Sequence, residues 1–200
     1  MKAILISIKP EWVAKILNGD KTIEIRKTAP KCDLPIDVYI YCAKRIPYLH
    51  VIYDLKTRKP RYILDKKKWY MAKNGKVVAK FTLRNVEKLE RYTGVYIPET
   101  ILHTDSIHTR YSMEKKSCLS MDEIWEYTNG NGYAWHISDL VIFDEPKGLG
   151  EFKYWKEYPS CKKCPHNDDE YDVATCENKC KELLRIKRPP QSWQYVEVAE

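Results

Sequence analysis

Three ionisable side chains of opposite sign stand close together near the N-terminus. Lys21, Glu24 and Arg26 follow Gly19 within the stretch NGDKTIEIRK. A lysine beside another cation can have a lowered pKa and act as a nucleophile or base. A carboxylate can relay a proton or accept from a nucleobase amino group, and a guanidinium can hold a phosphate or carbonyl. The triple therefore predicts a polar pocket, with the solvated face of an edge strand as the alternative.

A second group with chemical potential lies near the C-terminus, where four cysteines form C-x2-C-x11-C-x3-C. They are Cys161, Cys164, Cys176 and Cys180. Two close pairs separated by about a dozen residues are typical of a tetrahedral zinc site, and four thiolates leave no open position for catalysis. We therefore expect a structural zinc ion in an insertion at about 155–185. An iron–sulfur cluster is the competing interpretation, and His166 could replace one of the cysteines.

The other three cysteines, Cys32, Cys42 and Cys118, are scattered. The total of 7 is odd, which argues against a disulfide framework and fits the cytoplasm. Cys42 ends an apolar run and is expected in the core. Any of the three could be a nucleophile, but the sequence singles none out.

The elements that position the charged triple follow from local patterns. The apolar run at 2–8 predicts a strand, too short for a membrane span or a signal-peptide core. A helix over 10–18 follows, beginning with a proline and ending before a glycine. Residues 22–26 alternate as a half-buried strand, so Glu24 and Arg26 share one face.

The rest of the chain predicts an α+β fold. Its five or six strands and two or three helices come in mixed order, which favours a small, mostly antiparallel β-barrel with flanking helices over a doubly wound sheet. Ser120 and Glu123 form a capping box for a helix over 121–128. The other expected strands cover residues 36–42, 75–89, 133–144 and 192–198.

Two segments lack a clear period. Residues 44–74 form an insertion in which basic and aromatic side chains are interleaved, with a hairpin expected between RYILD and KKWYMA. Such a composition suits a nucleic-acid-facing surface, although a solvated insertion would look similar. Residues 90–119 are mixed, and a loop of that length often has functional content.

The N-terminal stretch SIKPEWVAKILNGDKTIEIRK resembles the opening of ASCH domains, which are members of the PUA-like superfamily. Their signature is a helix followed by G-x-K-x-x-E-x-R, and every fixed position is present. YAWHISDLVIFDEP and RPPQSWQYVEV resemble later strands of phage and bacterial ASCH proteins. The resemblance implies a single domain over 1–200, with insertions at 44–74 and at the cysteine cluster. It also implies a barrel whose cleft receives Lys21, Glu24 and Arg26.

The resemblance further implies that the cleft binds RNA or a modified nucleotide. Some small bacterial ASCH proteins look like amidohydrolases of N4-acetylcytidine that use a lysine, a threonine and a glutamate, and others look like ribonucleases. The lysine corresponds to Lys21, whereas Glu24 stands where the threonine would be. The third residue could be Glu123 or Glu114. If the chain is an enzyme, Lys21 and Glu24 are therefore its expected catalytic residues.

Further cleft residues are expected on the strand over 133–144. His136 and Ser138 share one of its faces and could bind the ligand, while Trp135 faces the other way. Gln191 and Ser192 open the last strand and could reach a base edge. Trp12 and Trp193 are expected in the core rather than stacked on bases.

Composition adds a moderate preference for polyanionic partners. The net charge is +7, with 35 Lys+Arg against 28 Asp+Glu, and 15 Tyr and 6 Trp could supply stacking surfaces. No apolar run is long enough to cross a membrane, and we expect the cytoplasm. The leading prediction is RNA or modified-nucleotide binding. The alternatives are a hydrolase of nucleic acid or nucleosides, and a phage or mobile-element protein that binds a host protein.

Overall fold

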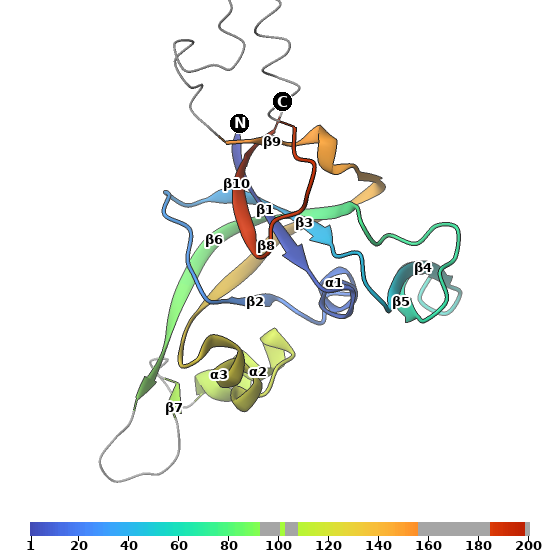
Figure 1. The fold of residues 1–200 in the computed structure, drawn as a ribbon. Helices are drawn as coiled ribbons and strands as arrows, with labels where there is room; N and C mark the ends of the chain where they lie inside the picture. Colours follow the sequence, from blue (N-terminus) through green and yellow to red (C-terminus); the bar gives the residue numbers. More distant parts are fainter. Residues whose placement is uncertain (93–100, 103–107, 156–184, 199–200) are drawn as a thin grey trace, which may run out of the picture.

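The protein is built around one strongly curved sheet (Figure 1). The computed structural model describes residues 1–92, 101–102, 108–155 and 185–198. The sheet contains β1 (Lys2–Ile8), β2 (Ile23–Arg26), β3 (Ile36–Cys42), β6 (Val77–Tyr92), β7 (Ile101–Leu102), β8 (Asn131–Lys147), β9 (Lys153–Tyr154) and β10 (Trp193–Glu197). The other elements are the hairpin β4 (Tyr48–Asp54) and β5 (Lys59–Asp65), the helices α1 (Pro10–Leu17), α2 (His108–Ser117) and α3 (Met121–Thr128), and the short 3-10 helix η1 (Leu149–Glu151).

The sheet is open, so the expectation of a closed β-barrel is wrong. Its strand order is β2-β8-β6-β3-β1-β10-β9, with β7 attached to β6, and the end strands β2 and β9 do not pair. Pairing is antiparallel except between β1 and β3. Closure would need a continuous backbone ladder around the sheet. The side chain of Arg26 on β2 contacts the end of β1 and Ser192, and no backbone ladder joins the two edge strands among the described residues.

The central strands explain the apolar runs of the sequence. On β1, Ile4 and Ile6 face one core cluster, whereas Ala3 and Leu5 face a second cluster that also contains Phe152. Both faces of this strand are therefore buried, and the run is nearly continuous rather than alternating. The predicted bounds of β1 and β3 agree with the structure.

The helix α1 carries the chain from β1 to β2. Pro10 occupies its first turn, where no backbone donor is needed, and Val13 and Ile16 face the core. The helix ends at Asn18, and Gly19 has φ +83°, a left-handed conformation that glycine adopts at little cost. Because the helix stops here, Lys21 lies just before the start of β2.

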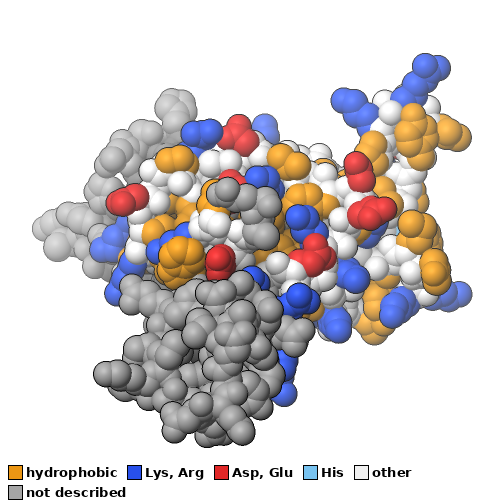
Figure 2. Space-filling model, turned by 90° about the horizontal axis from the view of Figure 1, so that it is seen from above, with side chains coloured by type: hydrophobic (Ala, Val, Ile, Leu, Met, Phe, Trp, Pro, Cys, Tyr) orange, Lys and Arg blue, Asp and Glu red, His pale blue; other side chains and the backbone are white. Residues whose placement is uncertain are grey.

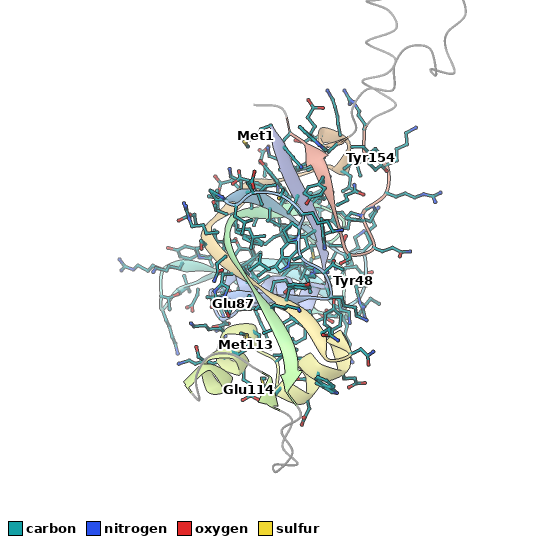
Figure 3. All side chains as sticks on the ribbon, turned by 90° about the vertical axis from the view of Figure 1, so that its left-hand side faces the viewer. Met1, Tyr48, Glu87, Met113, Glu114 and Tyr154 are labelled. Carbon is teal, nitrogen blue, oxygen red and sulfur yellow. The ribbon has the colours of Figure 1, made fainter. Side chains whose placement is uncertain are left out.

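The helices α2 and α3 lie together beside β2 (Figure 1). The predicted capping box of α3 is confirmed, because Glu123 N donates to Ser120 Oγ and Ser120 N donates to Glu123 Oε2. The sequence did not predict α2, whose composition is polar. Met113 is buried on it, and Figure 3 shows Met113 and Glu114 on this helix at the end of the molecule away from Met1.

The hairpin β4–β5 projects from the body beside α1 (Figure 1). The sequence analysis paired RYILD with the following KKWYMA, and this is wrong. The strand β5 pairs with the preceding strand β4, and Asp54 stands opposite Lys59 across a turn over 55–58.

No helix among the described residues is long and apolar enough to cross a membrane.

Candidate functional site

A pocket lies at the outer edge of β2, where the open sheet meets α1 and α3. Its volume is about 360 Å³, within the size range of small-molecule sites. Its walls come from four parts of the chain that are distant in sequence: the end of β1 with the start of α1, the strand β2, the region of α3, and Gln191 before β10. The charged triple forms part of this wall, as the sequence predicted.

The triple forms a buried ionic network. Lys21, Glu24 and Arg26 are 2 %, 6 % and 6 % exposed. Lys21 Nζ lies 3.4 Å from Glu24 Oε2, and Arg26 Nη2 lies 3.0 Å from Glu24 Oε1. One carboxylate is therefore shared by two cations, which leaves one positive charge in excess at the pocket wall. The alternative of a solvated face is excluded, because all three side chains are buried.

Backbone carbonyls complete the coordination of the two cations. Lys21 Nζ donates to Ser117 O at 2.6 Å. Arg26 Nη2 donates to Ser7 O at 2.8 Å, and its Nη1 donates to Ser192 Oγ at 3.3 Å. Within the described residues, Arg26 Nε is buried without a hydrogen-bond partner. A buried donor without an acceptor is costly, so a ligand acceptor would stabilise this position.

Burial changes the proton affinity of Lys21. Removal from water lowers the pKa of its ammonium below the ordinary 10.5, and the attraction of Glu24 opposes this shift without cancelling it. Lysines with a lowered pKa can act as bases or nucleophiles at neutral pH. The network is therefore suited to proton transfer as well as to recognition.

This lowered pKa predicts how stability depends on pH. Between the lowered pKa and 10.5, the unfolded chain binds the Lys21 proton more tightly than the folded chain, so stability should rise with pH. Compared with Lys21→Met, the wild type should gain stability from pH 7.5 to 10, at no more than about 1.4 kcal/mol per pH unit. Urea unfolding of both proteins measures this difference. Lys31→Met, at an exposed position, is the control, and a flat difference would contradict the prediction.

Two aromatic side chains stand at the pocket, each with a lysine nearby. Trp12 of α1 has Lys21 Nζ at 5.3 Å from its ring centroid, and Tyr127 of α3 has Lys27 Nζ at 5.3 Å. Lys9 also lines the pocket and is exposed. The sequence analysis assigned Trp12 to the core, and it does pack against the main core cluster. It contributes to the pocket as well.

The two glutamates considered as a third catalytic residue have different positions. Glu123 lines the pocket, where its hydrogen bonds from Ser120 lower its pKa. It is therefore ionised near neutral pH, and it already accepts the capping hydrogen bonds of α3. Glu114 does not line the pocket, and its carboxylate accepts from Met121 N at 2.9 Å.

His136 and Ser138 lie outside the pocket. Trp135, not His136, stands opposite Glu24 in the pairing of β2 with β8, so His136 projects from the other face of the sheet. There its Nε2 lies 3.0 Å from Glu87 Oε1, and Figure 3 labels Glu87. Neither His136 nor Ser138 is among the residues that line the pocket. Their ligand-binding role stays a prediction that this geometry does not favour.

Of the cysteines, Cys42 lies in the core, Cys32 and Cys118 are partly exposed, and the other four lie in a part of the chain that the structure does not describe. Burial raises the pKa of Cys42 to about 12, which makes it an inert core residue. The predicted ligands Cys161, Cys164, Cys176 and Cys180 lie outside the described residues. Elsewhere in the described parts of the chain, no group of three His, Cys, Asp or Glu residues could hold a metal ion.

The fold and the signature at β2 define a known class of domain, and comparison with known proteins identifies it. The family model of the ASCH domain matches residues 6–195. The chain therefore belongs to the ASCH domain family.

Solved structures of an ASCH protein have a similar fold. An ASCH protein from Zymomonas mobilis is 16% identical, with a TM-score of 0.51 over 98% of this chain and 87% of that one. Two single-substitution variants of the Zymomonas mobilis protein, also 16% identical, give TM-scores of 0.51 and 0.50 over 98% of this chain and 91% and 88% of theirs. At this identity the likeness concerns the fold alone. Among curated proteins, none matches the chain.

Proposed function

We propose that the pocket at β2 binds a nucleobase, either in RNA or as a modified nucleotide. The observation that carries this proposal is the buried network of Lys21, Glu24 and Arg26 in the wall of a pocket of about 360 Å³. Membership of the ASCH family is consistent with RNA binding.

The network offers both kinds of hydrogen-bonding group that a base edge requires. Arg26 Nε is a donor without a partner among the described residues, and it could donate to a carbonyl or ring nitrogen of a base. The Glu24 carboxylate could accept from an exocyclic amino group. Trp12 and Tyr127 supply aromatic surfaces on which a base could stack. The excess positive charge favours an attached phosphate.

Equilibrium dialysis with a panel of ordinary and modified nucleosides, including N4-acetylcytidine, tests this proposal. We expect the wild type to bind at least one member selectively. Lys21→Met should bind that member about tenfold more weakly or worse, because it removes an ionised hydrogen-bonding group. Lys31→Met serves as the matched control. Equal affinity of the wild type and Lys21→Met for every nucleoside would overturn the assignment of this pocket.

A hydrolase of nucleosides or nucleic acid is the second candidate, and the lowered pKa of Lys21 favours it. In this mechanism Lys21 would act as base or nucleophile and Glu24 as proton relay. Chromatography of the same incubation mixtures tests it. Turnover by the wild type and its loss in Lys21→Ala would make the protein an enzyme. Tight binding without turnover would leave Lys21 as a recognition residue.

We also propose that the four-cysteine cluster holds structural zinc, because its spacing suits a tetrahedral site. The purified protein should contain stoichiometric zinc by elemental analysis, and Cys161→Ser/Cys164→Ser should lose it. Cys32→Ser is the matched control, since Cys32 lies outside the cluster. Iron with acid-labile sulfide in place of zinc would instead support the cluster alternative.

A further inference from the structure

The net positive charge of the protein is accounted for by one segment. Residues 44–71, which we name the basic arm, contain nine Lys or Arg residues and two acidic residues. This excess equals the net charge of +7 of the whole chain, because the remaining residues contain 26 of each sign. The network of Lys21, Glu24 and Arg26 has one excess positive charge, and other residues outside the arm balance it. The basic arm is therefore the dominant source of attraction for a polyanion.

The basic arm is held firmly to the body. Asn18 at the end of α1 behaves like a strand partner: its Nδ2 donates to Tyr62 O, and Tyr62 N donates to its Oδ1, both at 2.9 Å. At the base of the hairpin, Asn74 Nδ2 donates to Arg45 O and Asn74 Oδ1 accepts from Leu49 N, both at 2.7 Å. The backbone of the arm is therefore anchored at two points, which lowers the entropic cost of binding.

Aromatic side chains on the arm are exposed to an unusual degree. Tyr53 is 62% exposed and Tyr70 is fully exposed, while Trp69 stacks on His50 with ring centroids 4.4 Å apart and keeps 44% of its surface exposed. Figure 2 shows hydrophobic and basic side chains mixed on the projection at the right of the molecule, where Figure 1 places β4 and β5. Exposed aromatic groups beside cations are what single-stranded nucleic acid binds.

One face of the hairpin mixes charged and apolar side chains, which favours nucleic acid over a membrane as the partner. Helices that lie on a membrane surface segregate an apolar face from a charged one. On the hairpin, Ile52 stands directly opposite Arg61, and the same face contains Asp54 and Lys59. This mixture of charged and apolar side chains suits single-stranded nucleic acid, which offers both phosphates and bases.

We propose that the basic arm is a second nucleic-acid contact, which binds the backbone and stacked bases of single-stranded RNA without sequence preference. This proposal rests on the proposed function in one respect: the RNA strand that binds the arm would also enter the pocket. The helix α1 connects the two sites, with Trp12 at the pocket and Asn18 at the arm. Its eight residues span about 12 Å, so a strand of a few nucleotides could contact both.

Titration of an oligouridylate of about 20 nucleotides at several salt concentrations tests the proposal. The arm variant is Lys56→Gln/Lys59→Gln/Arg61→Gln. The control variant removes three exposed cations elsewhere, Lys31→Gln/Arg185→Gln/Lys187→Gln. Each phosphate contact contributes about 0.7 to the slope of log affinity against log salt for single strands. We expect the arm variant to lower the slope by about 2, and the control variant to leave it nearly unchanged.

Each other outcome is informative. Equal slopes for the arm variant and the wild type would overturn the arm proposal, while a loss of nucleoside binding in Lys21→Met would still support the pocket. Binding of the wild type to anionic phosphatidylserine vesicles, with no binding to the oligouridylate, would overturn it in favour of a membrane surface. Tyr70→Ala adds a test free of charge effects: it should weaken oligonucleotide binding about fivefold or more.

Discussion

Replacing Glu24 by leucine is expected to lower the free energy of unfolding by about 3–5 kcal/mol. Glu24 is the anion in direct contact with both Lys21 and Arg26, and both cations are buried. Without it, two positive charges would remain close together in a poorly solvated place. The pKa of Lys21, already lowered by burial, would fall further because the attraction that opposes this shift is lost. Chemical unfolding at pH 7 measures the change in stability.

Two variants separate this effect from a simple loss of charge. Glu126→Leu removes an exposed carboxylate of α3 and should change stability by no more than about 0.5 kcal/mol. The double variant Lys21→Met/Glu24→Leu removes a cation together with the anion and should recover part of the loss, because a buried pair can be replaced by apolar side chains at little cost. A loss below about 1 kcal/mol in Glu24→Leu would show that water reaches the network.

Local signals in the sequence predicted the core of the fold and the triple. The apolar runs of β1 and β3, the helix stop at Gly19 and the capping box of Ser120 each depend on neighbouring residues alone. The sharing of a face by Glu24 and Arg26 depends only on the two-residue period of a strand.

Features that depend on distant parts of the chain were not predictable in this way. The choice between Trp135 and His136 as the neighbour of Glu24 depends on the register of β2 against β8, and a shift of one residue reverses it. The open sheet depends on whether β2 and β9, which are far apart in the sequence, pair with each other. The helix α2 is polar, so its tertiary packing rather than a hydrophobic period determines it.

Trp12→Ala is expected to weaken nucleotide binding by about 1–3 kcal/mol, or roughly 5- to 150-fold. Trp12 lines the pocket while its indole packs against the core, so the ring is held in place before a ligand arrives. Lys15 Nζ and Lys21 Nζ lie 4.7 and 5.3 Å from its ring centroid, so a stacked base would lie close to two ammonium groups. Those charges would attract an attached phosphate as well.

Two other substitutions of Trp12 test whether the loss of binding affinity comes from stacking in the pocket. Trp12→Phe keeps an aromatic face and should retain most of the affinity, whereas Trp12→Leu keeps the apolar volume and should lose nearly as much as Trp12→Ala. Trp155→Ala removes a tryptophan that is 46% exposed and does not line the pocket, and it should leave binding unchanged. Isothermal titration with the nucleoside selected by the dialysis panel measures all four variants. If Trp12→Leu binds as tightly as the wild type, Trp12 acts as a core residue only, and recognition rests on the charged network alone.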